Sequence, residues 1–178
     1  GLVPCLVDSD DEVTVWDSLA IVEYLAETYP GVWPEDKAAR AWARCASAEM
    51  HSGFGALRAE CPMNCGVRVG LKELSAGLSN NLARLDTLWQ EGLERFGGPF
   101  LAGGQLSAVD AFYAPVAFRV QTFNLPLSDA SLAYGQRLLA LPAMEEWYQA
   151  ALAETWREPM HEQDTFKNGP LLNDYRAV

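Results

Sequence analysis

The spacing of hydrophobic and polar residues changes near residue 17. Two short apolar runs, at residues 4–7 and 13–16, flank a polar turn and predict a β-hairpin. From residue 19 the apolar positions recur at helical spacing, which predicts a helix ending near Pro30. The following segment, to Pro34, holds two prolines and a glycine and predicts a linker. Because a two-stranded hairpin is only marginally stable in water, this β-β-α unit cannot be a domain alone.

The chain after the linker is predicted to be helical. A serine and an aspartate, Ser107 and Asp110, form an S-x-x-D capping box at the start of one helix, with Leu106 and Ala111 as the accompanying hydrophobic staple. The last twenty residues are polar and predict irregular structure. Apolar periodicity predicts helices over residues 36–58, 71–96, 107–123, 131–141 and 142–156.

Composition narrows the class of protein. The chain has 178 residues, of which 49% are hydrophobic, so it can bury a sizeable core, and this composition argues against disorder. Its net charge of −11 and pI of about 4.5 leave no basic stripe for nucleic acid or for an anionic membrane surface. No apolar run has the length of a transmembrane helix, and no signal segment is recognisable. We expect a cytoplasmic protein whose sequence, lacking an initiator methionine, begins inside a domain.

The cysteines are expected to be reduced thiols. Cys5, Cys45, Cys61 and Cys65 show no C-x-x-C spacing, and helical patterns surround most of them. A metal site combining His51 with Cys61 and Cys65 is an alternative, but structural zinc sites usually repeat a tighter ligand spacing. The sequence therefore predicts no metal.

The stretch VPCLVDSDDEVTVWDSLAIVEYLAETYP carries a specific motif. It resembles the V-P-x-L…[ED]-S-x-A-I-x-x-Y-L pattern in the thioredoxin-like domain of cytosolic glutathione transferases. The resemblance implies a cis Pro4, which lets the backbone of Val3 pair with the cysteinyl unit of glutathione. It also implies that Ser18, at a helix N-terminus, receives the γ-glutamyl carboxylate while Asp17 accepts from the γ-glutamyl ammonium. The alternative is that Ser18 merely caps the helix and Pro4 ends a loop.

A second motif, EMHSGF at residues 49–54, resembles the E-L-H-x-G-F stretch of beta-class bacterial transferases. The resemblance implies that His51 reaches the sulfur region of glutathione. It also implies that Glu49 contacts the γ-glutamyl end bound to the neighbouring subunit. A histidine within a helix is otherwise usually a satisfied core or surface residue.

The segment RAECPMNCGVR, residues 58–68, falls where this family places the rim of the electrophile pocket. Phe54, Arg58 and Met63 are therefore candidates to line a substrate pocket. The alternative, which we favour for each residue taken singly, is an ordinary loop between two helices.

The resemblance covers residues 1 to about 160 and defines the expected fold class. It implies an α+β, mostly α protein: the second half of a thioredoxin-like glutathione-binding domain at residues 1–32, followed by an all-helical C-terminal domain at 36–178. The family's first strand, first helix and second strand have no counterpart here. Because the catalytic Tyr, Ser or Cys lies at the end of that first strand, no residue is assigned this role, and Cys5 is not a candidate.

The resemblance implies a homodimeric glutathione transferase. Glutathione would be the co-substrate, and its thiolate would attack a small electrophile. A glutathione-dependent isomerase or dehalogenase on the same fold is the enzymatic alternative, because fold does not fix the reaction. A non-catalytic interaction module is the alternative from another class, but retention of both Val3-Pro4 and Asp17-Ser18 argues against it. An all-helical metal protein is the third alternative.

Overall fold

The computed structural model describes residues 3–176. Residues 1 and 2 of the first predicted domain and residues 177 and 178 of the second lie outside this range. Among the described residues, no helix combines the length and apolar character needed to cross a bilayer. The chain divides into two compact units, one of Gly1–Gly53 with Gly92–Phe112 and one of Phe54–Glu91 with Tyr113–Val178.

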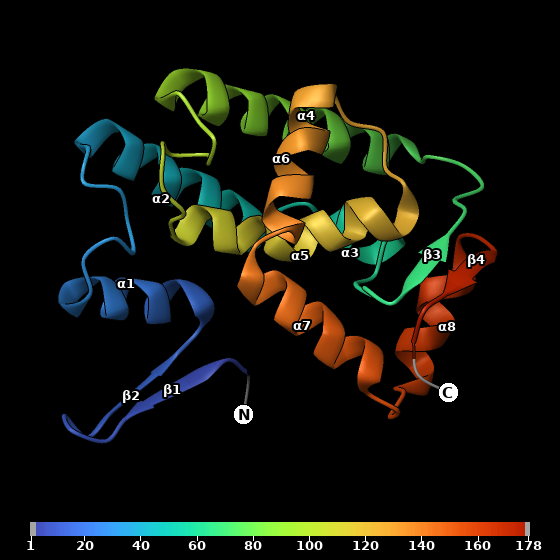
Figure 1. Ribbon diagram of the computed structural model, residues 1–178, viewed down its shortest axis with the longest axis horizontal. Coiled ribbons are helices and arrows are strands. Elements are labelled where there is room, and N and C mark those ends of the chain that lie inside the picture. The colour runs from blue at the N-terminus through green and yellow to red at the C-terminus, as the bar shows by residue number, and fades with distance from the viewer. Residues whose placement is uncertain (1–2, 177–178) are drawn as a thin grey trace. The chain divides into compact units, whose positions relative to one another are not determined.

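The first unit begins with the predicted hairpin and helix. Strands β1 and β2 pair antiparallel, with Cys5 opposite Trp16 and Asp8 opposite Val13, and α1 follows directly (Figure 1). The hairpin and helix predicted for this region are thus confirmed. Their bounds, with those of the next helix of the unit, are β1 (Cys5–Asp8), β2 (Val13–Trp16), α1 (Ser18–Thr28) and α2 (Lys37–Ser52).

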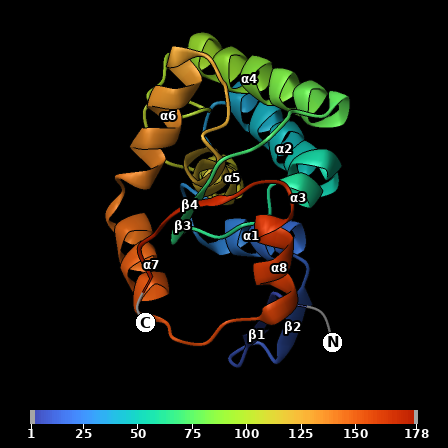
Figure 2. The ribbon, with the colours of Figure 1, turned by 90° about the vertical axis from the view of Figure 1, so that its right-hand side faces the viewer.

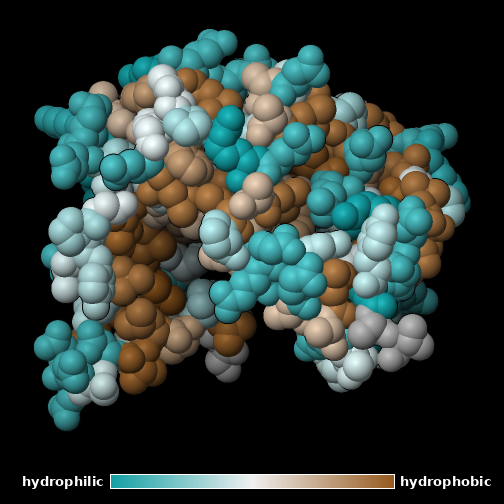
Figure 3. Space-filling model, in the orientation of Figure 1, coloured by the Kyte–Doolittle hydropathy of each residue, from teal (hydrophilic) through white to brown (hydrophobic). Residues whose placement is uncertain are grey.

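The hairpin and α1 present an uncovered apolar surface. No residue of α1 is buried, although most of its side chains are apolar. On the strands, Val7 is 72% exposed and Trp16 is 66% exposed. Figure 3 shows hydrophobic atoms gathered over this part of the molecule. Contiguous exposed apolar surface on a folded protein usually marks a face that packs against another polypeptide.

Helix α2 supplies much of the core of the first unit. It buries one stripe of small and apolar residues and packs Trp42 edge-on against Phe96, with ring centroids 5.6 Å apart. Gly92 permits this packing, because a Cβ atom there would lie 2.5 Å from the Trp42 ring and 2.7 Å from the carbonyl oxygen of Leu101.

The second unit is mainly helical. The aromatic core around Trp89 is well defined, since its ring lies edge-on to Tyr113 at 5.7 Å and to Tyr134 at 4.8 Å. Helices α4 and α5 begin in one unit and end in the other. The elements along this part of the chain are α3 (Gly55–Glu60), β3 (Val67–Val69), α4 (Ala76–Phe96), α5 (Ala108–Phe123), α6 (Asp129–Leu139), α7 (Pro142–Ala153), α8 (Pro159–Lys167) and β4 (Leu171–Asp174).

The C-terminal segment differs from the prediction. The prediction of irregular structure is wrong for residues 159–167, which form α8, and for residues 171–174, which form β4 and pair antiparallel with β3 (Figures 1 and 2). Arg176 holds the segment through ion pairs to Glu162 and Asp174, each with a closest distance of 2.7 Å. Its side chain lies where a Cβ atom on Gly66 would be. The region after residue 36 is therefore dominated by helices but also contains a small two-stranded sheet.

The start of α5 is built around the buried carboxylate of Asp110. Its Oδ2 accepts from the backbone N–H of Ser107 at 2.9 Å, which is the return bond of the predicted capping box. Its Oδ1 accepts from the N–H of Leu101 at 3.0 Å, a contact that the motif does not predict. The two residues of the predicted staple both lie at the surface, since Leu106 is 47% exposed and Ala111 is also exposed.

Replacing Asp110 by alanine should strongly destabilise the protein. Two backbone N–H groups would lose their acceptor inside the fold, at about 1–3 kcal/mol each, so we expect the free energy of unfolding to fall by about 3 kcal/mol. Ser107→Ala is the matched control, because its hydroxyl lies 3.4 Å from the carboxylate and should contribute under about 1 kcal/mol. Urea unfolding measures both variants. Equal losses would show that Asp110 does not organise this helix start.

Candidate functional site

The start of α1 carries the residues singled out by the first motif. Asp17 is the N-cap: its Oδ1 accepts from the N–H of Leu19 at 2.9 Å, and Ser18 is the first helical residue. The alternative in which Ser18 caps the helix is therefore wrong. The Val3-Pro4 bond is cis, as the motif implies, and Val3 is 90% exposed at the entrance to β1.

The backbone of Asp17 adopts an unusual conformation. Its φ is 76° and its ψ is 132°, in a region that residues with a side chain seldom occupy. Such outliers persist where the surrounding structure enforces them and are concentrated at functional sites. The cap thus combines a carboxylate with a disfavoured backbone at an exposed helix end.

His51 joins Asp17 and Ser18. Its Nε2 lies 3.2 Å from Asp17 Oδ2, and its Nδ1 lies 3.3 Å from Ser18 Oγ. The side chains of His51 and Asp17 are 35% and 45% exposed, so water and ligands can reach both. The structure thus brings three of the predicted site residues together in one unit.

The end of helix α2, just after His51, explains this placement. The predicted helix over residues 36–58 is wrong, because α2 ends at Ser52 and α3 starts at Gly55. A Cβ atom on Gly53 would lie 2.6 Å from the carbonyl oxygen of Glu49, so only glycine fits where the chain leaves α2. Phe54 then turns the chain with a left-handed φ of 57°. The break leaves His51 in the last turn of α2.

Two side-chain contacts hold α1 against its neighbours. Arg44 of α2 donates from Nε and Nη2 to the two carboxylate oxygens of Glu23, both at 2.8 Å. Tyr24 donates to Asp8 of the hairpin at 2.8 Å. This hydrogen bond raises the pKa of Tyr24 to about 12 and lowers the pKa of Asp8. Both contacts fix α1, and with it the Asp17 cap, relative to α2 and β1.

The residues predicted to line a substrate pocket have different environments. Phe54 is 6% exposed and belongs to the core of the second unit. Arg58 is exposed in the last turn of α3. Met63 is half-buried and lines a pocket of about 240 Å³ with residues of the C-terminal segment. The lining of this pocket includes neither Phe54 nor Arg58.

Glu49 is half-buried, one turn before Gly53, and its carbonyl oxygen accepts from the N–H of that glycine.

The buried cysteines are held as thiols. Cys61 is fully buried, and this burial raises its pKa to about 12, while burial also raises the pKa of Cys65. Arg119 donates from Nε to the carbonyl oxygen of Cys61 at 2.9 Å, and burial lowers the pKa of this guanidinium to about 10. Within residues 3–176, no group of three or more His, Cys, Asp or Glu could hold a metal ion.

Two features of this region have little or no signal in the sequence. The contact of His51 with both Asp17 and Ser18 depends on tertiary packing, and the glycine that ends α2 was its only signal. The buried Arg119 had no sequence signal beyond being an arginine in an apolar helix.

A family profile described as the C-terminal domain of glutathione S-transferase matches residues 35–150. Two curated proteins are similar in sequence, both named probable maleylacetoacetate isomerase. The one from Caenorhabditis elegans is 32% identical over 71% of this chain, and the one from Vibrio cholerae is 30% identical over 82%. The chain spans 59% of the first relative's length and 70% of the second's.

Solved structures show the same fold. A glutathione transferase homolog from Burkholderia gl BGR1, crystallised with bound glutathione, superposes with a TM-score of 0.60 at 24% identity. The match covers 84% of this chain and 73% of that one. At this identity the likeness establishes the fold alone.

The four cysteines should separate into two classes of reactivity. Cys5 and Cys45 are exposed, whereas Cys61 and Cys65 are buried and their pKa values are raised. Because the thiolate is the reactive form, iodoacetamide at about pH 8 should label the exposed pair in the native protein and all four after denaturation. Intact-protein mass and peptide mapping give the count. Labelling of Cys61 at the rate of Cys45 would contradict its burial.

Proposed function

Because the chain belongs to the glutathione S-transferase family, we propose that it is an enzyme using glutathione as co-substrate and transferring its thiolate to small electrophiles. The observation that carries this proposal is the Asp17–Ser18 pair at the start of α1, where His51 contacts both side chains. The names of the relatives and the glutathione bound in a protein of the same fold support it.

The start of α1 suits the γ-glutamyl end of glutathione. This end carries a carboxylate and an ammonium group next to each other. The first-turn N–H groups and the positive end of the helix dipole favour the carboxylate near Ser18. The Asp17 carboxylate, 45% exposed, is available to the ammonium. The exposed backbone of Val3 would pair with the cysteinyl unit as an added strand does.

We assign His51 to the γ-glutamyl end rather than to the sulfur. The beta-class resemblance implies a thiol-side role, but the imidazole lies within 3.3 Å of both Asp17 and Ser18 side chains. In this position it orients the two groups that receive the ligand. His51 is then a positioning residue of the binding site.

The remaining assignments depend on further polypeptide. We propose a homodimer in which Glu49 contacts the γ-glutamyl group bound to the partner subunit. The uncovered apolar surface of β1, β2 and α1 would pack against the other strands and helix of a thioredoxin-like sheet, which would also supply the thiol-activating residue. Phe54, Arg58 and Met63 remain candidates to line the electrophile pocket.

A glutathione-dependent isomerase is the second candidate function. It is favoured by the two relatives named probable maleylacetoacetate isomerase. The two reactions differ in their stoichiometry, because a transferase consumes one thiol per turnover whereas an isomerase returns glutathione unchanged. Titrating the remaining free thiol after turnover of an electrophile or of maleylacetoacetate distinguishes them.

Loss of the Asp17 charge should weaken glutathione binding. Asn is as good a helix cap as Asp, so Asp17→Asn keeps the start of α1 but removes the charge that the ammonium requires. We expect the Kd for glutathione to rise about 10- to 100-fold, equivalent to about 1.5–3 kcal/mol. Isothermal titration calorimetry measures it.

Asp36→Asn is the matched control for this experiment. Asp36 caps α2 in the same way, accepting from the N–H of Ala39 at 2.8 Å, and has no role in the proposed site. It should leave the affinity unchanged. Equal affinities in the wild type and Asp17→Asn would rule out the proposed orientation of glutathione.

The role of His51 can be separated from thiol activation. His51→Gln should weaken glutathione binding by about 3- to 10-fold, the effect of one modest hydrogen bond. It should not change the pH at which the bound thiol ionises, which the thiolate absorbance near 240 nm reports. A change in that pH with unaltered affinity would return His51 to the sulfur side.

A further inference from the structure

The ion pair between Arg44 and Glu23 joins α2 to α1 away from the residues of the proposed glutathione site. Arg44 donates from Nε and Nη2 to the two carboxylate oxygens of Glu23, both at 2.8 Å. Its guanidinium also lies over the ring of the buried Trp33, with Cζ 5.6 Å from the ring centroid. One side chain of α2 therefore contacts both α1 and the segment that connects the two helices.

This ion pair and the contacts of His51 join the same two helices at matching positions. On α2, His51 follows Arg44 by seven residues, which is about 10 Å along the helix. On the α1 side, Asp17 precedes Glu23 by six residues, or about 9 Å. The order of the contacts is reversed between the helices, so α1 and α2 run in opposite directions where they meet. Both contacts can therefore form together in only one register of α1 along α2.

Apolar packing does little to fix this register. No residue of α1 is buried, so the helix lacks the interdigitated core that would resist sliding. The hydrogen bond from Tyr24 to Asp8 joins α1 to the hairpin rather than to α2. A guanidinium that pairs with a carboxylate through two parallel hydrogen bonds has a fixed fork geometry. The Arg44–Glu23 pair is thus suited to set the position of α1 along α2.

The other contact point, at His51, is the one that a ligand would disturb. Asp17 Oδ1 accepts from the N–H of Leu19, and its Oδ2 lies 3.2 Å from His51 Nε2. A ligand ammonium that pairs with Asp17 would approach the oxygen that faces the imidazole. The Arg44–Glu23 pair lies about two turns of α2 away and would still hold α1 when the ligand is bound.

We propose that Arg44 is a positioning residue of the glutathione site, acting through Glu23 to hold the carboxylate of Asp17 in place beside His51. This inference rests on the proposed function. Arg44 has no contact with the ligand in this role. Its effect on binding comes from keeping the start of α1 where the side chains of Asp17, Ser18 and His51 meet.

Charge reversal separates positioning from a general electrostatic effect. Arg44→Glu opposes two carboxylates and Glu23→Arg opposes two guanidinium groups, so each should displace α1 and raise the Kd for glutathione about 10-fold. Glutathione carries a net negative charge, so a field effect alone would shift the two affinities in opposite directions. The double variant restores the pair with its partners exchanged, and its Kd should return to within about 3-fold of the wild type. Isothermal titration calorimetry measures each value.

The ring of His51 reports the position of α1 without a ligand. We expect its NMR signals to shift at constant pH in Arg44→Glu and in Glu23→Arg, and to return toward their wild-type positions in the double variant. A purely structural ion pair would lower the melting temperature but leave these signals in place. If the wild type does not bind glutathione, the proposed function fails, and the His51 signals still decide whether Arg44 positions α1.

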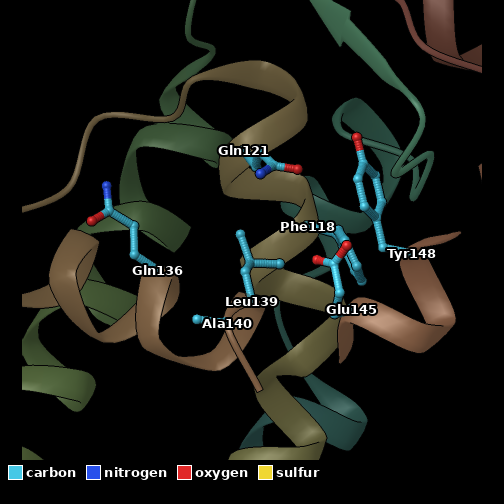
Figure 4. Close-up of a pocket in the computed structure, with 7 residues that line it drawn as sticks. All are labelled: Phe118, Gln121, Gln136, Leu139, Ala140, Glu145 and Tyr148. Atoms are coloured by element: carbon cyan, nitrogen blue, oxygen red, sulfur yellow. The ribbon is translucent and has the colours of Figure 1, made fainter. Parts of the chain in front are cut away.

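Two controls locate the effect. Lys37→Glu reverses a charge of the same sign on an exposed residue about two turns before Arg44, and it should leave the Kd and the His51 signals unchanged. The second control uses a pocket of about 300 Å³ between α5, α6 and α7 of the second unit, whose lining includes Glu145 and Tyr148 (Figure 4). Glu145→Gln should leave the Kd unchanged, and a change would locate glutathione in that pocket and overturn the proposal.

Three further results would each overturn the proposal. Unchanged Kd values in Arg44→Glu and Glu23→Arg would show that the ion pair does not position the site. A double variant that binds no better than the single variants would show that the pair itself is not what binding requires. Unmoved His51 signals in both single variants would show that α1 keeps its position without the pair.

Discussion

The buried carboxylate of Asp110 is the contact on which the first unit depends. It accepts from Leu101 and Ser107, so it joins the loop after α4 to the first turn of α5. The next N–H, of Ala108, donates to the carbonyl oxygen of Val32 at 2.8 Å, so the segment after α1 is held against the start of α5. A fully buried charge is tolerable only when its acceptor capacity is used, and here it is used to order backbone from two segments, the loop after α4 and the start of α5. Helix α5 can therefore start inside the protein, where unpaired N–H groups would otherwise be costly.

The carboxylate of Asp17 also caps a helix, but in a different environment and with a different proposed role. It is 45% exposed, and its second oxygen contacts the imidazole of His51 rather than backbone. The start of α5 is thus closed within the core by Asp110, whereas the start of α1 stays open to solvent. An open helix N-terminus with an adjacent carboxylate can receive a ligand that carries both charges, whereas a closed one can only stabilise the fold.

Local sequence signals predicted the elements but not the contacts between distant segments. The hairpin, α1 and the return bond from Ser107 to Asp110 follow from residues close together in sequence, and they are confirmed. The prediction of one long helix over 36–58 was wrong. At Gly53 the chain leaves the helix so close to the carbonyl oxygen of Glu49 that only glycine fits, and this outweighs the helical periodicity around it. The pairing of β3 with β4 joins residues about a hundred positions apart, for which a polar C-terminal sequence gives no signal. The side chains of Asp17 and Ser18 could be named from the motif, but the position of His51 needed the end of α2 to be known.

The energetics of the Asp17–His51 contact favour a functional role over a stabilising one. A polar contact between side chains 35% and 45% exposed contributes at most about 1 kcal/mol to folding. The positive φ of Asp17 costs an amount of the same order, about 1–3 kcal/mol. The contact therefore does not offset the backbone strain through stability alone. Stability also does not require it, because an asparagine or a serine in an ordinary extended conformation would cap α1 equally well. A strained, exposed carboxylate beside an imidazole is the arrangement expected where a ligand, rather than the fold, completes the set of contacts.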